Sequence, residues 1–278
     1  MLGQLGEGAK PLAGGQSLIP LLKLRFANPE HLVDLNFIVG TSFVREEGSA
    51  LHFGAMTRHA EIERSEQVKR IPVLHDCAAG IADVQIRNRG TIGGSLAEAD
   101  PSGDWANALI TLDTTVHCLG SKGARKVALK DFILDAYTTA LERDELVTEV
   151  EVKTPPQGSG GAYVAFKRSA PVYPTASTAV QLTMEGDVCK DAAIALGCVG
   201  LTAIRAGEAE AALRGKTVDD RVVAAAAEAA RAAADPHPDM RGSADYKREL
   251  VAALVKRAIQ VALRRARGEQ VEGVHLYA

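Results

Sequence analysis

Short apolar runs bounded by polar residues follow one another through the first half of the chain. We predict strands at 31–36 and 50–57, where the apolar residues form runs of strand length. Two further runs, 114–120 and 125–132, predict strands for the same reason. Helix-like stretches lie between these runs, so the first half is expected to mix strands with helices.

Three helices in the same half are predicted from the residues at their starts. Thr57 suits an N-cap, because glutamates follow it in the first turns of a helical stretch. Pro72 suits the first turn of a helix over 71–83, where its missing N–H costs nothing. Asp104 opens a short amphipathic helix over 104–113.

The best linker candidate is TPPQGSGG at 154–161, because prolines and glycines crowd it. We therefore expect two domains, 1–155 and 160–278. After the linker, 162–169 and 176–200 predict a strand meander, with a hairpin turn at 185–187.

The last part of the chain is predicted to be helical. Residues 206–234 are Ala-rich and fit two helices, with Thr217 as the N-cap of the second. A final helix is predicted over 244–268, with Gly268 as a left-handed C-terminal cap. Its apolar stripe is interpreted as a core face and consists of Leu250, Leu254, Ala258 and Ala262.

Composition and charge narrow the function classes. The chain has 278 residues, 46% of them hydrophobic, and a formal net charge of −3 without a basic block, which disfavours nucleic acid as a partner. No run of 18 apolar residues predicts a membrane span, and the start has no long apolar segment of the kind a secretory signal needs.

The cysteines and histidines suggest no metal site. The four cysteines are scattered outside any CxxC pair, which disfavours zinc or an iron–sulfur cluster in this chain and suits a reducing cytoplasm; they are Cys77, Cys118, Cys189 and Cys198. His75 and His117 lie in apolar runs, and we interpret them as core residues rather than catalysts.

Two glycine loops carry the strongest chemical signal. AGGQSL and TIGGSL each offer two adjacent glycines and then a hydroxyl, Ser17 or Ser95. Glycine lets a ligand approach the backbone, and successive N–H groups in such a turn form a nest for an anion. We expect the two loops to clasp a pyrophosphate from two sides, although two ordinary turns remain the alternative. Neither loop is a Rossmann or P-loop signature.

With QIRNRGTIGG and AEADPSGD, the loops make the chain resemble the FAD-binding medium subunits of the molybdenum hydroxylase (xanthine dehydrogenase) family. The resemblance covers nearly the whole chain and is closest to the aerobic carbon monoxide dehydrogenases. It implies an α+β fold: a two-subdomain FAD-binding domain of the vanillyl-alcohol-oxidase (PCMH) type, followed by a smaller C-terminal α+β domain of the CO dehydrogenase flavoprotein type.

The resemblance also implies which residues hold FAD. The first loop, the second loop and four further positions match the family pattern. They are Ala13, Gly14, Gly15, Gln16 and Ser17; Thr91, Ile92, Gly93, Gly94 and Ser95; and Asp104, Leu146, Lys167 and Tyr173. No catalytic side chain and no metal ligand are implied in this chain, because the flavin itself accepts and passes on electrons.

The same resemblance implies that the chain works in a heterotrimer and that two such heterotrimers form a dimer. A small subunit with two [2Fe-2S] clusters supplies electrons, a large molybdopterin subunit oxidises the substrate, and NAD, oxygen or a quinone is the terminal acceptor. The complex is expected in the cytoplasm, with any membrane association made through partners. Aldehydes, purines and N-heteroaromatics are alternative substrates, and a stand-alone flavin oxidase or a FAD-free scaffold are alternatives of another class.

Two departures from the family pattern affect these expectations. The family has a strand and a helix before the first loop, whereas this loop begins barely a dozen residues in, so we expect a truncated N-terminal edge and a first subdomain without a partner strand. In KRSAPVYPTAS, Pro171 and Val172 replace a Gly-Asp pair while the aromatic Tyr173 is kept, which leaves the oxidant specificity open.

Overall fold

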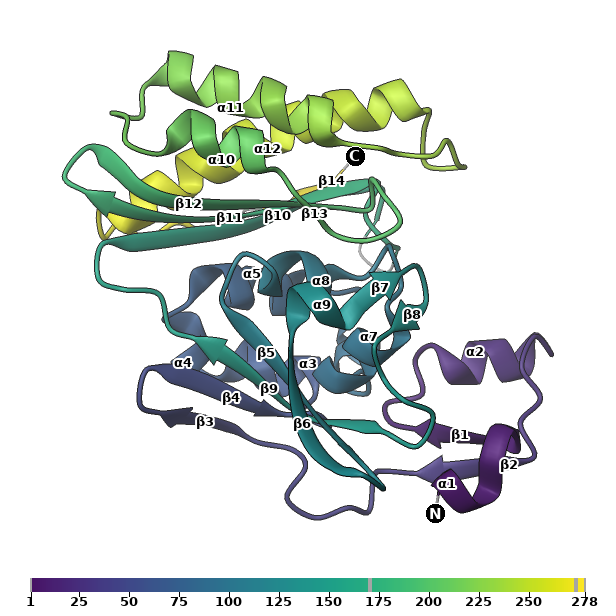
Figure 1. The fold of residues 1–278 in the computed structure, drawn as a ribbon. Helices are drawn as coiled ribbons and strands as arrows, with labels where there is room; N and C mark the ends of the chain where they lie inside the picture. Colours follow the sequence, from purple (N-terminus) through teal and green to yellow (C-terminus); the bar gives the residue numbers. More distant parts are fainter. Residues whose placement is uncertain (1, 170–171, 273–274, 278) are drawn as a thin grey trace.

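The computed structural model describes residues 2–169, 172–272 and 275–277. Two five-stranded sheets lie in separate layers with helices between them, and three more helices cover the outer face of the second sheet (Figure 1). The predicted α+β class is therefore confirmed.

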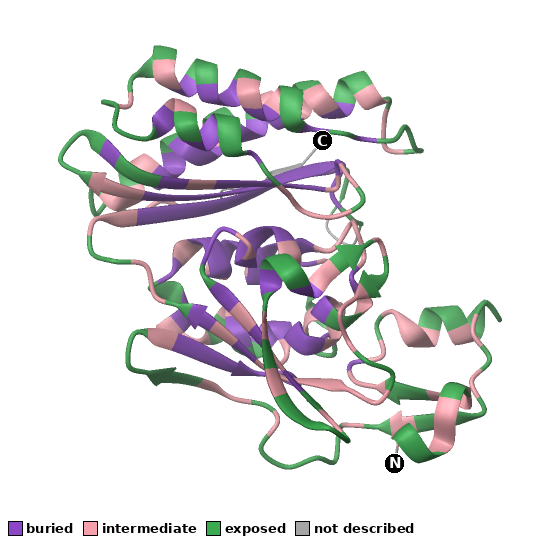
Figure 2. Ribbon diagram, viewed as in Figure 1, coloured by how far each residue is buried: buried purple, intermediate pink, exposed green. Residues whose placement is uncertain are grey.

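A small N-terminal unit stands beside the first sheet (Figure 1). It consists of α1 (Leu2–Leu5), the 3-10 turn Gly6–Gly8, β1 (Ala9–Leu12), α2 (Leu18–Lys23) and β2 (His31–Asp34). β1 and β2 pair in parallel, with Leu12 opposite Asp34. The expectation that this subdomain lacks a partner strand was wrong, since β1 directly precedes the first glycine loop and supplies it. Most of the unit is exposed or half-buried (Figure 2).

The first five-stranded sheet has the order β3-β4-β9-β5-β6 and carries helices on one face. Its strands are β3 (Val44–Glu47), β4 (Ala50–Gly54), β5 (Thr114–Gly120), β6 (Gly123–Ala128) and β9 (Leu146–Lys153). Its helices are α3 (His59–Arg64), α4 (Glu66–Lys69), α5 (Pro72–Gly80), α6 (Val84–Arg87), α7 (Ile92–Glu98), α8 (Asp104–Leu109) and α9 (Leu129–Phe132), and β7 (Ile133–Asp135) and β8 (Thr138–Thr139) form a short hairpin. Alternate strand residues such as Phe53, Val116 and Val150 pack with Trp105 in one core.

The second sheet has the order β13-β12-β11-β10-β14, and its strands β10 and β11 are buried on both faces along most of their length. Its strands are β10 (Ser159–Lys167), β11 (Ala176–Glu185), β12 (Val188–Gly197), β13 (Ile204–Arg205) and β14 (Leu276–Tyr277), and its helices are α10 (Gly207–Leu213), α11 (Asp220–Ala233) and α12 (Ala244–Ala266). Along β10, Ala162 and Val164 pack under these helices, whereas Tyr163 and Ala165 belong to the core of the first part. Because strand residues alternate between faces, β10 joins the two cores.

Most predicted elements exist, but two predicted N-caps were wrong. The hydroxyl of Thr57 is bonded to the backbone of Phe43, and α3 is instead capped at Arg58, whose N–H donates to Glu61 Oε2 at 2.8 Å. The second Ala-rich helix is capped by Asp219, which accepts from the N–H of Val222, and not by Thr217. Pro72 does lie in the first turn of α5.

Other boundaries also moved. The run 125–132 is a strand only as far as Ala128, where α9 takes over, and α8 ends at Leu109 rather than at 113. The predicted hairpin turn is confirmed, with Gly186 at φ +60°. Gly268 has φ +86° and follows α12, whose predicted stripe lies in the core.

Candidate functional site

The first glycine loop connects the end of β1 with the start of α2. Gly15 has φ +80°, and the N–H groups of residues 14–17 find no hydrogen-bond acceptor in the part of the chain that the structure describes. The hydroxyl of Ser17 is likewise not bonded to any described residue. A row of unsatisfied backbone donors in a tight turn is the arrangement that binds an anion.

The second glycine loop is built differently, because its N–H groups are already used. Ile92 donates to the carbonyl of Thr57 at 3.1 Å and Gly93 to that of Ala55 at 2.9 Å. Gly94 donates to the hydroxyl of Thr91, the N-cap of α7, at 3.2 Å. To anion binding this loop can therefore contribute mainly the half-buried hydroxyl of Ser95 and its own position beside the first loop.

The two loops lie side by side, as the sequence predicted. A Cβ on the buried Gly14 would stand 2.2 Å from the carbonyl oxygen of Arg89, just ahead of the second loop. A Cβ on Gly94 would stand 3.5 Å from that of Ala13. Glycine at position 14 is thus required by the contact between the loops themselves, and the free donors of the first loop are backed by the second.

Gly93 has another role than the one expected. A Cβ there would lie 2.5 Å from the Cβ of Ala55 and 2.8 Å from its backbone. The glycine allows the second loop to pack on the end of β4, so a valine at this position would disturb the fold directly and not only fill ligand space.

Asn36 and Arg58 also contact the loops, although the sequence analysis did not select them. The Nδ2 of Asn36 donates to the carbonyl of Ala13 at 3.0 Å. The guanidinium of Arg58 donates through one nitrogen to the carbonyl of Arg89 and through the other to Oδ1 of Asn36. Neither residue belongs to a glycine motif, and only the tertiary structure brings them to it.

A buried histidine supports the second loop from behind. Trp105 Nε1 donates to His59 Nδ1 at 3.0 Å, so the neutral ring carries its proton on Nε2. Burial, and then the nearby Arg58 and Arg87, lower the pKa of His59 to about 3. A Cβ on Gly90 would lie 2.6 Å from His59 Nε2, which explains the glycine before Thr91.

Asp104 and Lys167 lie together in the protein interior and not at the surface formed by the two loops. Tyr163 donates its hydroxyl proton to Asp104 Oδ1 at 2.5 Å, and Lys167, only 1% exposed, donates to the carbonyl of Gly80. Burial raises the pKa of the Asp104 carboxyl, and Lys167 acts against that rise. The helix that starts at Asp104 begins next to Ser95, because a Cβ on Gly103 would be 3.9 Å from its hydroxyl.

Tyr173 is exposed and Leu146 is half-buried. Tyr173 is 45% exposed, and the guanidinium carbon of Arg241 lies 5.6 Å from the centre of its ring. Burial and the neighbouring Asp100 raise the pKa of the Tyr173 hydroxyl. Leu146 is the half-buried first residue of β9. Val172 is 39% exposed, while the predicted effect of Pro171 falls outside the described residues.

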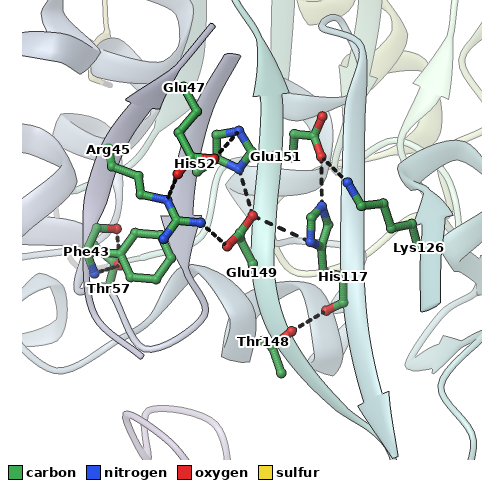
Figure 3. A network of polar contacts seen from close by, with 10 residues as sticks. All are labelled: Phe43, Arg45, Glu47, His52, Thr57, His117, Lys126, Thr148, Glu149 and Glu151. Atoms are coloured by element: carbon green, nitrogen blue, oxygen red, sulfur yellow. Dashed lines mark hydrogen bonds and ion pairs between the residues drawn. The ribbon is translucent and has the colours of Figure 1, made fainter. Parts of the chain in front are cut away.

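A separate polar network crosses the outer face of the first sheet (Figure 3). Glu149 of β9 bonds His52 of β4 at 2.7 Å, and Glu151 bonds His117 of β5 at 2.8 Å and Lys126 of β6 at 2.9 Å. The interpretation of His117 as a core residue was therefore wrong. Among the described residues, no group of three or more His, Cys, Asp or Glu side chains is arranged to hold a metal ion.

Two family models match the chain. The model described as the FAD binding domain in molybdopterin dehydrogenase matches residues 1–155. The model described as the CO dehydrogenase flavoprotein C-terminal domain matches residues 161–262. Among the described helices, none is both long and apolar enough to cross a membrane.

Curated relatives and solved structures agree with these models. The chain is 43% identical over 263 residues to the carbon monoxide dehydrogenase medium chain of Hydrogenophaga pseudoflava, covering 94% of this chain and 92% of that one. It is 40% identical to the 6-hydroxypseudooxynicotine dehydrogenase complex subunit alpha of Paenarthrobacter nicotinovorans, covering 96% and 91%. A solved structure of the Hydrogenophaga carbon monoxide dehydrogenase matches with a TM-score of 0.92 at 44% identity, covering 95% of this chain and 92% of that chain.

Proposed function

This chain belongs to the family of FAD-binding medium subunits of the molybdopterin dehydrogenases, and on that premise we propose that it is the electron-transfer subunit of an aerobic carbon monoxide dehydrogenase. FAD, when bound, supplies the chemistry by accepting electrons and passing them on singly or in pairs. The protein's part is to bind, orient and shield this group. The observation that carries the proposal is the row of N–H groups at residues 14–17, beside the second loop, for which the described residues offer no acceptor.

The binding residues follow from what each position offers. The loop Ala13, Gly14, Gly15, Gln16 and Ser17 would hold the pyrophosphate through its free N–H groups. The loop Thr91, Ile92, Gly93, Gly94 and Ser95 would close the other side with the Ser95 hydroxyl. Leu146 would contact the flavin ring system through its backbone, and Tyr173 would lie near the same ring system. Asp104 and Lys167 would support the site from the interior.

The proposed division of labour within the chain follows its two sheets. Residues 1–155 would form the FAD-binding domain with its two subdomains, and residues 160–278 the C-terminal domain that closes over it. The joint is tight, because Tyr163 and Ala165 of β10 are part of the first domain's core.

The iron–sulfur clusters belong to a partner subunit, and the chemistry of the cysteines agrees with this. Cys77, Cys118, Cys189 and Cys198 are all free thiols. Burial raises the pKa of each of them, to about 11 for Cys189 and about 12 for Cys198, so they stay protonated at neutral pH. A cluster needs thiolates.

The proposed complex contains a small iron–sulfur subunit and a large molybdopterin subunit, assembled as a dimer of heterotrimers in the reducing cytoplasm. Electrons would leave this chain for a quinone, NAD or oxygen, with Tyr173 near the exit. The substrate is bound by the large subunit, so the choice of carbon monoxide rests on the similarity of whole chains. The 40% identity to a 6-hydroxypseudooxynicotine dehydrogenase subunit keeps an N-heteroaromatic substrate as the second candidate.

The test is to purify the complex from cells that coexpress the chain with the small and large subunits encoded beside it. We expect anaerobic carbon monoxide to bleach the flavin of the complex, and not that of the chain alone. Bleaching by an N-heteroaromatic compound instead selects the second candidate. Turnover by the chain alone would identify a stand-alone oxidase, and a colourless complex would overturn the FAD role itself. Reoxidation with each acceptor in turn then identifies the terminal oxidant.

A further inference from the structure

Arg58 connects the two glycine loops through a continuous set of hydrogen bonds. One guanidinium nitrogen donates to the carbonyl of Arg89, immediately before the second loop. The other donates to Oδ1 of Asn36, whose Nδ2 in turn donates to the carbonyl of Ala13 in the first loop at 3.0 Å. The side chain therefore spans from one loop to a residue that holds the other.

Asn36 and Arg58 are themselves held in place by further hydrogen bonds. Asn36 also donates to Asp34 Oδ1 through its backbone N–H at 2.9 Å and through its Nδ2 at 2.6 Å, at the end of β2. The backbone N–H of Arg58 donates to Glu61 Oε2 at 2.8 Å, which places the residue at the start of α3. The planar guanidinium can make two hydrogen bonds in different directions at once, which an ammonium group on a flexible stem does poorly.

The carbonyl that Arg58 holds is also the one on which the first loop rests. A Cβ on Gly14 would lie 2.2 Å from that Arg89 oxygen, so the position of this carbonyl sets how closely the loops approach. The free N–H groups of residues 14–17 begin at the same contact. A shift of Arg89 would therefore move the donors that face the anion.

We propose that Arg58, acting with Asn36, is a positioning residue that fixes the spacing of the two glycine loops and thereby determines the affinity of this chain for FAD. The inference rests on the proposed function. Its physical basis is preorganisation: a cradle held in the binding conformation before the ligand arrives loses less conformational entropy on binding. Arg58 acts through the loops and is not assigned a contact with the cofactor.

The experiment compares the full-length chain carrying Arg58→Ala, Arg58→Lys, Asn36→Ala and the double change Arg58→Ala with Asn36→Ala. Arg64→Ala is the matched control, because it removes the same charge from an exposed position on the same helix. FAD affinity is measured by titrating FAD into the apoprotein and following flavin fluorescence. The visible circular dichroism of the bound flavin and the urea midpoint of each apoprotein are recorded with it.

We expect Arg58→Ala to raise the Kd for FAD by about 10- to 100-fold, the range for losing hydrogen bonds made by a charged group. Arg58→Lys should recover part of this loss. Arg58 and Asn36 act through one set of hydrogen bonds. The Kd of the double variant for FAD should therefore lie within about threefold of the Kd of Arg58→Ala alone. The visible circular dichroism of the flavin bound to Arg58→Ala should differ from that of wild type. The urea midpoint of the Arg58→Ala apoprotein should equal that of the Arg64→Ala apoprotein.

Three results would overturn the inference. The first is an Arg58→Ala Kd within about twofold of wild type while the wild-type chain binds FAD. The second is additive loss in the double variant, and the third is a loss of affinity that merely follows a lowered urea midpoint. If Arg58→Ala does not fold, the same criteria apply to Arg58→Lys and Asn36→Ala. A wild-type chain that binds no FAD removes both this inference and the proposed function, whereas the other results concern Arg58 alone.

Discussion

Asp76 and Arg265, 189 positions apart in the sequence, form a two-pronged ion pair in the interior, with N–O distances of 2.6 and 3.0 Å. Asp76 lies on α5 and also accepts the N–H of Tyr163 at 3.1 Å, while Arg265 near the end of α12 donates to the carbonyl of Gly161 at 2.8 Å. This pair fastens the last helix to the first part of the chain across β10.

Arg265→Met should strongly destabilise the protein. Both side chains of the pair are about nine-tenths buried, so the change would leave the Asp76 carboxylate in the interior without its charged partner. We expect the free energy of unfolding in urea to fall by about 3–5 kcal/mol. The control is Arg267→Met, whose pair with Asp187 is exposed and should contribute at most about 1 kcal/mol. Equal effects of the two substitutions would refute the role given to the buried pair.

Gly14→Ala should remove FAD from the purified chain. The new Cβ would clash with the Arg89 carbonyl, so the first loop must move away from the second. The control is Gly207→Ala at the start of α10, where a Cβ meets no described atom within 4 Å and should leave stability unchanged or raise it by up to about 1 kcal/mol. The measurement is flavin per chain from the absorbance spectrum. Retention of full flavin by the Gly14 variant would show that the loops need not touch.

Stability should fall as the pH drops below about 6.5, in part because of His59. Its folded pKa of about 3 lies below the value of about 6.5 that an unfolded chain has, so the unfolded state binds the proton first. The stability that neutral His59 contributes is fully present above its pKa in the unfolded chain, and it is lost as the pH falls towards its pKa in the folded chain. Between about pH 7.5 and pH 5 we expect a loss of about 2 kcal/mol from this residue.

The comparison for His59 uses His59→Gln, which keeps an acceptor for the Trp105 N–H. Urea unfolding at several pH values should show a shallower decline for this variant than for wild type. Parallel declines would mean that other groups account for the pH dependence.

Tyr173→Ala in the assembled complex should change the rate of flavin reoxidation more than the FAD content. The ring is 45% exposed and packs against the Arg241 guanidinium, so its removal opens a surface without emptying a core. Stopped-flow reoxidation and flavin content are measured on the same preparation. A fall in flavin content alone would make Tyr173 a packing residue. Tyr173→Phe, which keeps the ring, serves as the control.

The amino-acid sequence determined the features that depend on neighbours along the chain. The apolar stripe of α12, the Gly186 turn, the Gly268 cap and the two glycine loops are all local patterns, since side-chain spacing and backbone freedom act over a few residues. The N-caps show that even local patterns can fail. Thr57 is a suitable capping residue, but its hydroxyl is bonded to the backbone of Phe43, the residue directly before β3.

Only the tertiary structure decided which loop keeps its donors free. The amides of Ile92 and Gly93 are used by Thr57 and Ala55, which lie more than thirty residues earlier, whereas nothing described takes those of residues 14–17. The same holds for Arg58 with Asn36. Each backbone N–H has one hydrogen to donate. Whether it can bind a ligand therefore depends on whether the fold has already brought an acceptor from a distant segment to it.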